Sequence, residues 1–110
     1  MSLNGEEEKV KHILTDSKLS AIKAMLEKDH AIDCLLLLHL KKGKWKDAKG
    51  FMVENNLTLS DGTFRSRMIE IAGLGFAKSE RIDPLKKYYL PTELGEKVAK
   101  LLLDFFAEFK

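Results

Sequence analysis

The sequence predicts a mainly α-helical domain with one small β-hairpin. Apolar residues recur with a period near 3.6 along most of the chain, which is typical of amphipathic helices. After Gly75 the period changes to about 2, and two short runs flank an Asp-Pro turn. With 110 residues, 45% apolar and 33% charged, the chain (1–110) is expected to be a single globular domain with a modest core.

Three helices are expected in the first 42 residues. The first spans about residues 6–14 and the second spans 18–28. Asp29 can cap the third helix, residues 30–42, in which the run 32–38 is apolar nearly all round. A helix of that kind is buried, so it is expected to be the central core helix.

A short strand and two helices are expected next. Residues 44–46 alternate in polarity as a strand does, and Asp47 can cap a helix that ends near Asn55. A turn then leads to Ser60, which is a good N-cap for the helix predicted over about residues 60–73.

The helix over 60–73 has two contrasting faces. Phe64, Met68 and Ile71 share one face, because they follow at i, i+4 and i+7. Small and hydroxyl residues such as Ser66 lie opposite, with Arg65 on the flank. Such a helix can lie in the major groove of DNA, where Arg reads guanine edges and Ser or Thr reaches bases or phosphates. The same pattern also fits an ordinary amphipathic helix with a solvated face.

A β-hairpin and a long helix are expected to end the chain. Residues 76–82 and 87–90 read as strands around the turn. Thr92 can cap the last helix, 93–109. Its expected apolar face comprises Leu94, Val98, Leu101, Leu102, Phe105 and Phe109. The expected order of elements is a core helix, a strand, two helices and a hairpin. This is the order of a winged helix, in which the first strand pairs with the hairpin.

Three stretches resemble the winged-helix transcription regulators of the MarR, HxlR and PadR type. They are residues 57–82 (LTLSDGTFRSRMIEIAGLGFAKSERI), residues 83–87 (DPLKK) and residues 89–95 (YLPTELG). The resemblance implies a winged-helix core over residues 30–90, in which the 76–90 hairpin is the wing. Residues 6–28 and 92–109 would then be flanking helices.

The resemblance also implies a surface that binds double-stranded DNA. Residues expected at the major groove lie at the start of helix 60–73: Ser60, Asp61, Gly62, Thr63, Arg65 and Ser66. Arg65 is assigned to base edges. Arg67 diverges from it by about 200° around the helix, so it is assigned to a phosphate or an internal acid. Residues expected at the DNA backbone are Lys44, Lys46 and Lys49 beside the preceding helix, and Lys78, Arg81, Lys86 and Lys87 in the wing.

The distribution of charge favours an anionic partner at the middle of the chain. Residues 41–59 carry five Lys against two acids, and residues 60–90 carry six Lys or Arg against four acids. Residues 1–40 and 91–110 are both net acidic. The positive charge therefore coincides with the candidate DNA-binding segments. The alternative is a solvated basic surface.

The first and last helices carry more apolar residues than one core-facing stripe can hold. Leu103 and Phe106 fall off the stripe of the last helix, and Met25 is a further surplus residue. Two-fold pairing would bury the surplus and predicts a homodimer. The expected interface comprises Val10, Ile13, Leu14, Leu102, Leu103, Phe105, Phe106 and Phe109. The alternative is a monomer in which the N-terminal helices cover the last helix.

Metal binding and catalysis are weakly indicated. His30, Asp33, Cys34 and His12 suggest a metal site, but zinc takes three or four ligands and no second paired motif appears. Cys34 lies in the most apolar segment, where burial makes a thiol inert. No cofactor and no enzymatic activity are therefore expected.

The sequence-based hypothesis is a sequence-specific, homodimeric DNA-binding transcription regulator. A single cysteine fits a reducing cytoplasm, the N-terminus lacks a secretory signal, and no run approaches the ~20 apolar residues of a membrane span. An effector ligand is left open. The alternative function is a winged-helix module that binds proteins and not DNA.

Overall fold

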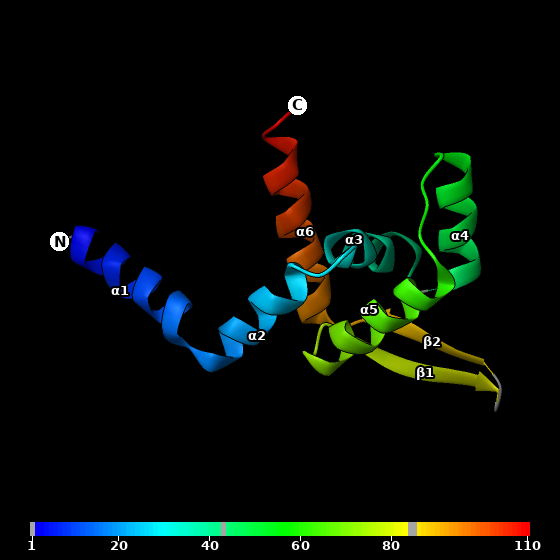
Figure 1. Ribbon diagram of the computed structural model, residues 1–110, viewed down its shortest axis with the longest axis horizontal. Coiled ribbons are helices and arrows are strands. Elements are labelled where there is room, and N and C mark those ends of the chain that lie inside the picture. The colour runs from blue at the N-terminus through cyan, green and yellow to red at the C-terminus, as the bar shows by residue number, and fades with distance from the viewer. Residues whose placement is uncertain (1, 43, 84–85) are drawn as a thin grey trace.

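The computed structural model describes residues 2–42, 44–83 and 86–110. The described part contains six helices and a two-stranded antiparallel sheet, as Figure 1 shows. The mainly helical fold with one small sheet is therefore confirmed. The elements are α1 (Ser2–Thr15), α2 (Ser17–Leu26), α3 (Ala31–Lys41), α4 (Trp45–Glu54), α5 (Asp61–Gly73), β1 (Ala77–Asp83), β2 (Lys86–Pro91) and α6 (Glu93–Ala107).

Helix α3 forms the centre of the core. It packs against α4, α5, α6 and β2, so most of its circumference is covered. Its buried residues are Ala31, Cys34, Leu35, Leu37 and Leu38. A helix with apolar residues all round can be covered in this way, so the expected central position of the 30–42 segment is confirmed.

Helix α5 lies against α3 and β1 through its apolar back. Phe64, Met68 and Ile71 are at most 5% exposed, as their spacing predicted. At the helix start, the backbone N–H of Thr63 donates to Ser60 Oγ at 3.0 Å. Since this bond satisfies one of the free N–H groups of the first turn, the predicted N-cap is confirmed.

The hairpin pairs Ala77 with Pro91 at its inner end and Asp83 with Lys86 toward its tip, with an irregularity after Arg81. Its inner end is anchored in the core, where Phe76, Ala77 and Tyr89 are buried. The strands then run outward beneath α5 (Figure 1). Strand β1 also lies against α5, so the hairpin begins beside that helix.

The strand expected at residues 44–46 is not present. Lys44 has an extended backbone but is the N-cap of α4, and Trp45 already begins the helix. The buried residues that follow Trp45 are Ala48 and Met52, at i+3 and i+7. This spacing is that of a helix and not of a strand. Trp45 stacks on Phe64 with ring centroids 4.4 Å apart, which draws it toward α5.

The expected caps of two helices also differ in the structure. His30, and not Asp29, occupies the N-cap position of α3, in a left-handed conformation (φ 61°) and without a side-chain capping bond. Asp47 lies in the first turn of α4 and does not cap it. A carboxylate in the first turn still interacts favourably with the helix dipole.

The face of α6 that packs on the core is narrower than expected. Gly95 and Ala99 are buried, and Val98 and Leu102 are half-buried against the core. Small residues allow α6 to lie close to its neighbours, and the rest of the predicted apolar stripe points outward. The exposed members are Leu94, Leu101, Phe105 and Phe109.

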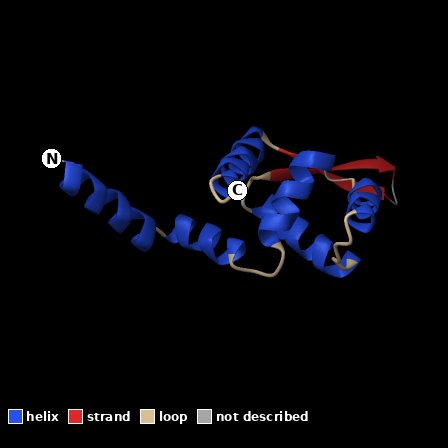
Figure 2. Cartoon of the chain, turned by 90° about the horizontal axis from the view of Figure 1, so that it is seen from above, coloured by secondary structure: helices blue, strands red, loops and turns tan. Residues whose placement is uncertain are grey.

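Two segments project from the body of the molecule. Helix α1 leads away from it beyond α2 (Figures 1 and 2), and the second half of α6 rises clear of it (Figure 1). The radius of gyration is 15.9 Å, compared with about 13 Å for a compact domain of this length.

Met25 of α2 is 4% exposed and belongs to the core, so its expected place among the surplus apolar residues is wrong. Among the described residues, no helix is long and apolar enough to cross a membrane.

Candidate nucleic-acid interface

The outer face of α5 is open to solvent along its first two turns. Asp61, Gly62, Arg65 and Ser66 are exposed, and Thr63 is half-buried beside the Ser60 cap. These are the positions expected at the major groove. They lie on one helix surface whose opposite side is fixed in the core.

Arg65 has no ion pair within the part of the chain that the structure describes. Its guanidinium is therefore available to an external acceptor. One turn further, Ile69 is 55% exposed on the same outer surface. An apolar side chain there suits either a thymine methyl group or a protein partner.

The lysines of α4 extend this surface. Lys44, Lys46 and Lys49 are exposed, as expected. The ammonium of Lys49 lies 4.0 Å from the carboxylate of Asp61, in the first turn of α5. This pair shows that the basic side of α4 lies next to the start of α5. A single extended partner can therefore contact α4 and α5 together.

The hairpin contributes two exposed basic residues from β1, Lys78 and Arg81. The Lys78 ammonium lies 3.6 Å from the Glu80 carboxylate, which reduces its net effect on the local potential. The other two expected contacts, Lys86 and Lys87, have side chains that lie outside the described residues.

Arg67 is directed away from the candidate interface. Its Nε lies 2.8 Å from Glu70 Oε1, and its Nη1 donates to the Asp29 carbonyl at 3.4 Å. Only 15% of its side chain is exposed. Of the two partners expected for Arg67, the internal acid is the one that the structure shows.

Glu70 also pairs with Lys28, the residue that sequence reasoning did not connect to α5. The carboxylate therefore joins α5 to the loop that follows α2. The i, i+3 spacing of Arg67 and Glu70 was a signal for the first contact. The second contact spans 42 positions and has no local signal.

A second charged cluster fixes α6 to α3, away from the candidate interface. Glu96 Oε1 accepts from the Lys42 ammonium at 2.7 Å, and Glu96 Oε2 lies 2.5 Å from His39 Nδ1. The hydrogen bond from Lys42, followed by the bond and charge of His39, holds the pKa of the Glu96 carboxyl below its usual value. The base of α6 is therefore held firmly while its far end projects.

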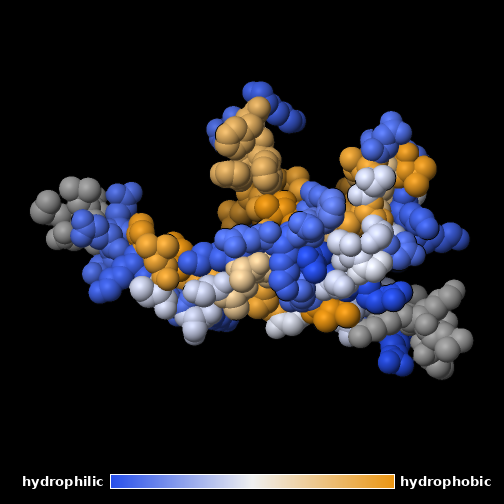
Figure 3. Space-filling view, viewed as in Figure 1, coloured by the Kyte–Doolittle hydropathy of each residue, from blue (hydrophilic) through white to orange (hydrophobic). Residues whose placement is uncertain are grey.

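The projecting segments carry the apolar residues expected at a dimer interface. Those that are exposed are Val10, Ile13 and Leu14 of α1 and Leu103, Phe105, Phe106 and Phe109 at the end of α6. The three Phe rings meet edge to face, at 5.1 and 5.4 Å between centroids. Figure 3 shows this apolar surface on the rising part of α6. Leu102, by contrast, packs against the core of its own chain.

No protein-family model, curated protein or solved structure was found to match this chain. Within residues 2–42, 44–83 and 86–110 there is also no group of three or more His, Cys, Asp or Glu side chains arranged to hold a metal ion. The functional interpretation therefore depends on the geometry and charge of the residues themselves.

Cys34 is expected to resist thiol reagents in the folded protein. It is 0% exposed, and burial, with a smaller contribution from Asp33, raises the pKa of its thiol to about 12. Because the thiolate is the reactive form, an aromatic disulfide reagent at about pH 8 should label it only in denaturant. Full labelling of the native protein within minutes would contradict this buried, inert role.

Proposed function

We propose that this chain is a winged-helix regulator of transcription that binds specific sequences in double-stranded DNA. Helix α5 enters the major groove and the 76–90 hairpin acts as the wing. The observation that carries this proposal is the two-sided character of α5. Its back is fixed in the core and its start is capped, while its outer face presents small residues and Arg65, which makes no ion pair among the described residues.

Charge placement supports the same function. Lys44 and Lys46 are exposed and make no ion pair among the described residues, and Lys49 joins their helix to the start of α5. Positive groups beside a recognition helix neutralise phosphates that flank the groove. The proposal requires no cofactor, and we place the protein in the cytoplasm, where its single cysteine stays reduced.

We further propose that the protein acts as a homodimer. Helix α1 and the end of α6 project from the body and expose apolar side chains. In a monomer, the contact of these side chains with water costs free energy. Pairing two copies through these segments covers both. A two-fold axis would also present two α5 helices about one DNA turn apart, roughly 34 Å, and so select a palindromic site.

The second candidate function is a module that binds another protein. Ile69, 55% exposed on the outer face of α5, favours it, because a side chain of that kind suits a protein partner. Arg65 and the lysines of α4 favour DNA. Direct measurement of DNA binding separates the two functions.

Replacing Arg65 with Ala is expected to relax discrimination at one base position of the preferred site. Loss of a bidentate contact to a base edge should cost roughly 1–3 kcal/mol on the specific sequence. Selection of duplexes from a random pool, followed by affinity measurements on specific and random DNA, measures this effect.

Lys46→Ala is the matched control, since Lys46 is also exposed but lies on α4. A lost phosphate contact should weaken specific and random sequences by the same factor. If Arg65→Ala also lowers the affinities for specific and random DNA by the same factor, Arg65 does not read a base.

A further inference from the structure

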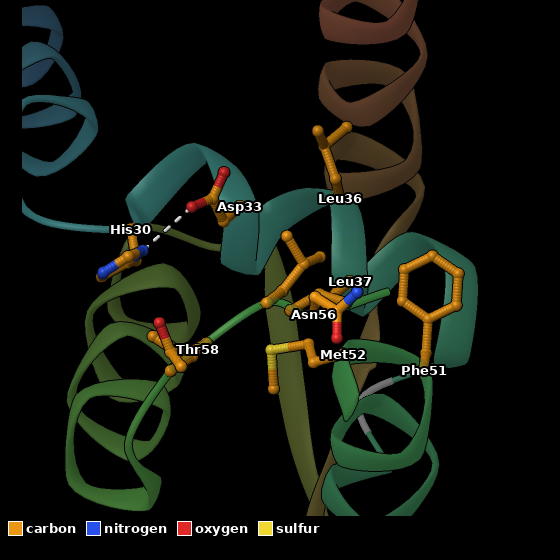
Figure 4. Close-up of a pocket in the computed structure, with 10 residues that line it drawn as sticks. His30, Asp33, Leu36, Leu37, Phe51, Met52, Asn56 and Thr58 are labelled. Carbon is orange, nitrogen blue, oxygen red and sulfur yellow. Dashed lines mark hydrogen bonds and ion pairs between the residues drawn. The ribbon is translucent and has the colours of Figure 1, made fainter. Parts of the chain in front are cut away.

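A cavity of about 410 Å³ lies between α3, α4 and the loop that leads into α5 (Figure 4). Sites for small molecules in proteins commonly occupy roughly 300–1,000 Å³. The cavity is open on one side and its walls come from three separate segments of the chain. Its volume is therefore large enough for a compact organic molecule.

The two ends of the cavity differ in polarity. His30, Asp33 and Thr58 lie together at one end, and the Phe51 ring lies at the other (Figure 4). Leu37 and Met52 form the apolar wall between them. A ligand that satisfies both ends has an apolar, preferably aromatic, body and a polar head group.

The charge at the polar end selects the head group. The carboxylate of Asp33 lies in the first turn of α3, and its Oδ2 is 2.9 Å from His30 Nδ1. Within the described part of the chain, the other oxygen of the Asp33 carboxylate has no hydrogen-bond partner, so it can accept a bond from a ligand. An ammonium group can donate to this oxygen, whereas a carboxylate would be repelled.

We infer that this cavity binds small amphipathic amines, which place an aromatic or aliphatic body against Phe51 and Met52 and an ammonium group at Asp33. The site is distinct from the exposed face of α5 and from the apolar ends of α1 and α6.

The cavity is connected to the start of α5. Thr58 and Leu59 line it, and they directly precede the Ser60 cap. A molecule in contact with them would favour one conformation of the turn over others. A regulatory role for that effect depends on the proposed DNA-binding function, but the binding of an amine does not.

Tryptamine and indole-3-propionate are suitable probes, because they share an indole body and differ in the charge of the head group. Each is titrated into the protein alone, with backbone amide NMR shifts as the readout. Tryptamine should bind saturably and shift residues 30–37 and 56–59. Indole-3-propionate should bind about three- to tenfold more weakly than tryptamine, as expected for the loss of one charge-assisted contact.

Two variants occupy the same position in different helices. Asp33→Asn removes the charge at the cavity and should weaken tryptamine about three- to tenfold. Asp47→Asn is its control, since Asp47 is also the third residue of its helix, α4, but does not line the cavity. Its affinity for tryptamine should equal that of the wild type.

Three results would overturn the inference. They are no saturable tryptamine binding, equal affinity for the two indoles, and shifts that map to the Phe side of α6 instead of the cavity. None of these results bears on DNA binding, which a separate titration with duplex DNA measures. If tryptamine binds at the cavity and DNA does not bind at all, the ligand site stands and the proposed function fails.

Discussion

The Phe106→Glu variant is expected to have the mass of one 12.5 kDa chain in solution, and the wild type twice that mass. Phe106 is 46% exposed on the part of α6 that projects from the body. In a monomer the new carboxylate would stay in water and disturb little. In a dimer it would be buried against apolar side chains without a partner, which is strongly unfavourable. Light scattering at micromolar concentration measures the masses.

Val53→Glu provides the control for this substitution. Val53 is 68% exposed on α4, outside the proposed interface, so its change to Glu should leave a dimer intact. A wild-type protein that is monomeric at micromolar concentration would rule out the homodimer and with it the expected palindromic site. A Phe106→Glu variant that stays dimeric would show that the interface lies elsewhere, and loss of the dimer in both variants would show that the effect is not specific to α6.

The Gly95→Ala variant is expected to lose a large part of its stability. A Cβ atom at position 95 would lie 1.9 Å from the Phe76 carbonyl oxygen, which belongs to the backbone. That carbonyl also accepts the backbone N–H of Thr92 at 3.1 Å, so it cannot move freely. Overpacking of this kind costs roughly 1–3 kcal/mol in the free energy of unfolding. Urea denaturation measures the difference.

Gly50→Ala is the matched control, because Gly50 lies within α4 and a Cβ atom there meets nothing within 4 Å. Removing a helical glycine should raise stability by roughly 0.5–1 kcal/mol. A Gly95→Ala variant as stable as the wild type would show that α6 can shift away from the loop before β1.

Elements with strong local signals could be predicted from the sequence. The Ser60 cap, followed by Phe64, Met68 and Ile71, predicted α5, and the structure confirms both its cap and its buried face. Thr92 likewise caps α6 as expected, with its hydroxyl accepting from the Gly95 N–H at 3.1 Å. Capping and periodicity involve neighbours within one or two turns, so a single sequence contains them.

Features that depend on distant segments could not be predicted. Three alternating residues at 44–46 suggested a strand, but the segment forms the start of a helix whose Trp45 packs on the distant Phe64. Leu101 points outward because it lies about 200° around α6 from the buried Ala99, and the burial of that face involves a close approach of Gly95 to the distant Phe76 carbonyl.

The candidate site shows the same division. The exposed positions of Arg65 and Ser66 follow from helical periodicity and agree with the structure. The inward turn of Arg67 depends on Glu70 together with the Asp29 carbonyl, which is remote in the sequence. The cavity beside Asp33 arises where α3, α4 and the following loop meet, so no single segment encodes it.

Titration of the wild-type protein with duplex DNA at salt concentrations between about 50 and 200 mM tests the DNA-binding function most directly. Each phosphate that a lysine or arginine neutralises should contribute a slope of about −0.9 to log affinity against log salt. A dimer that contacts six or more phosphates should lose roughly 10³-fold or more in affinity over this range. Affinity that stays flat across the range, or no binding at the lowest salt concentration, would contradict DNA binding and favour a protein partner.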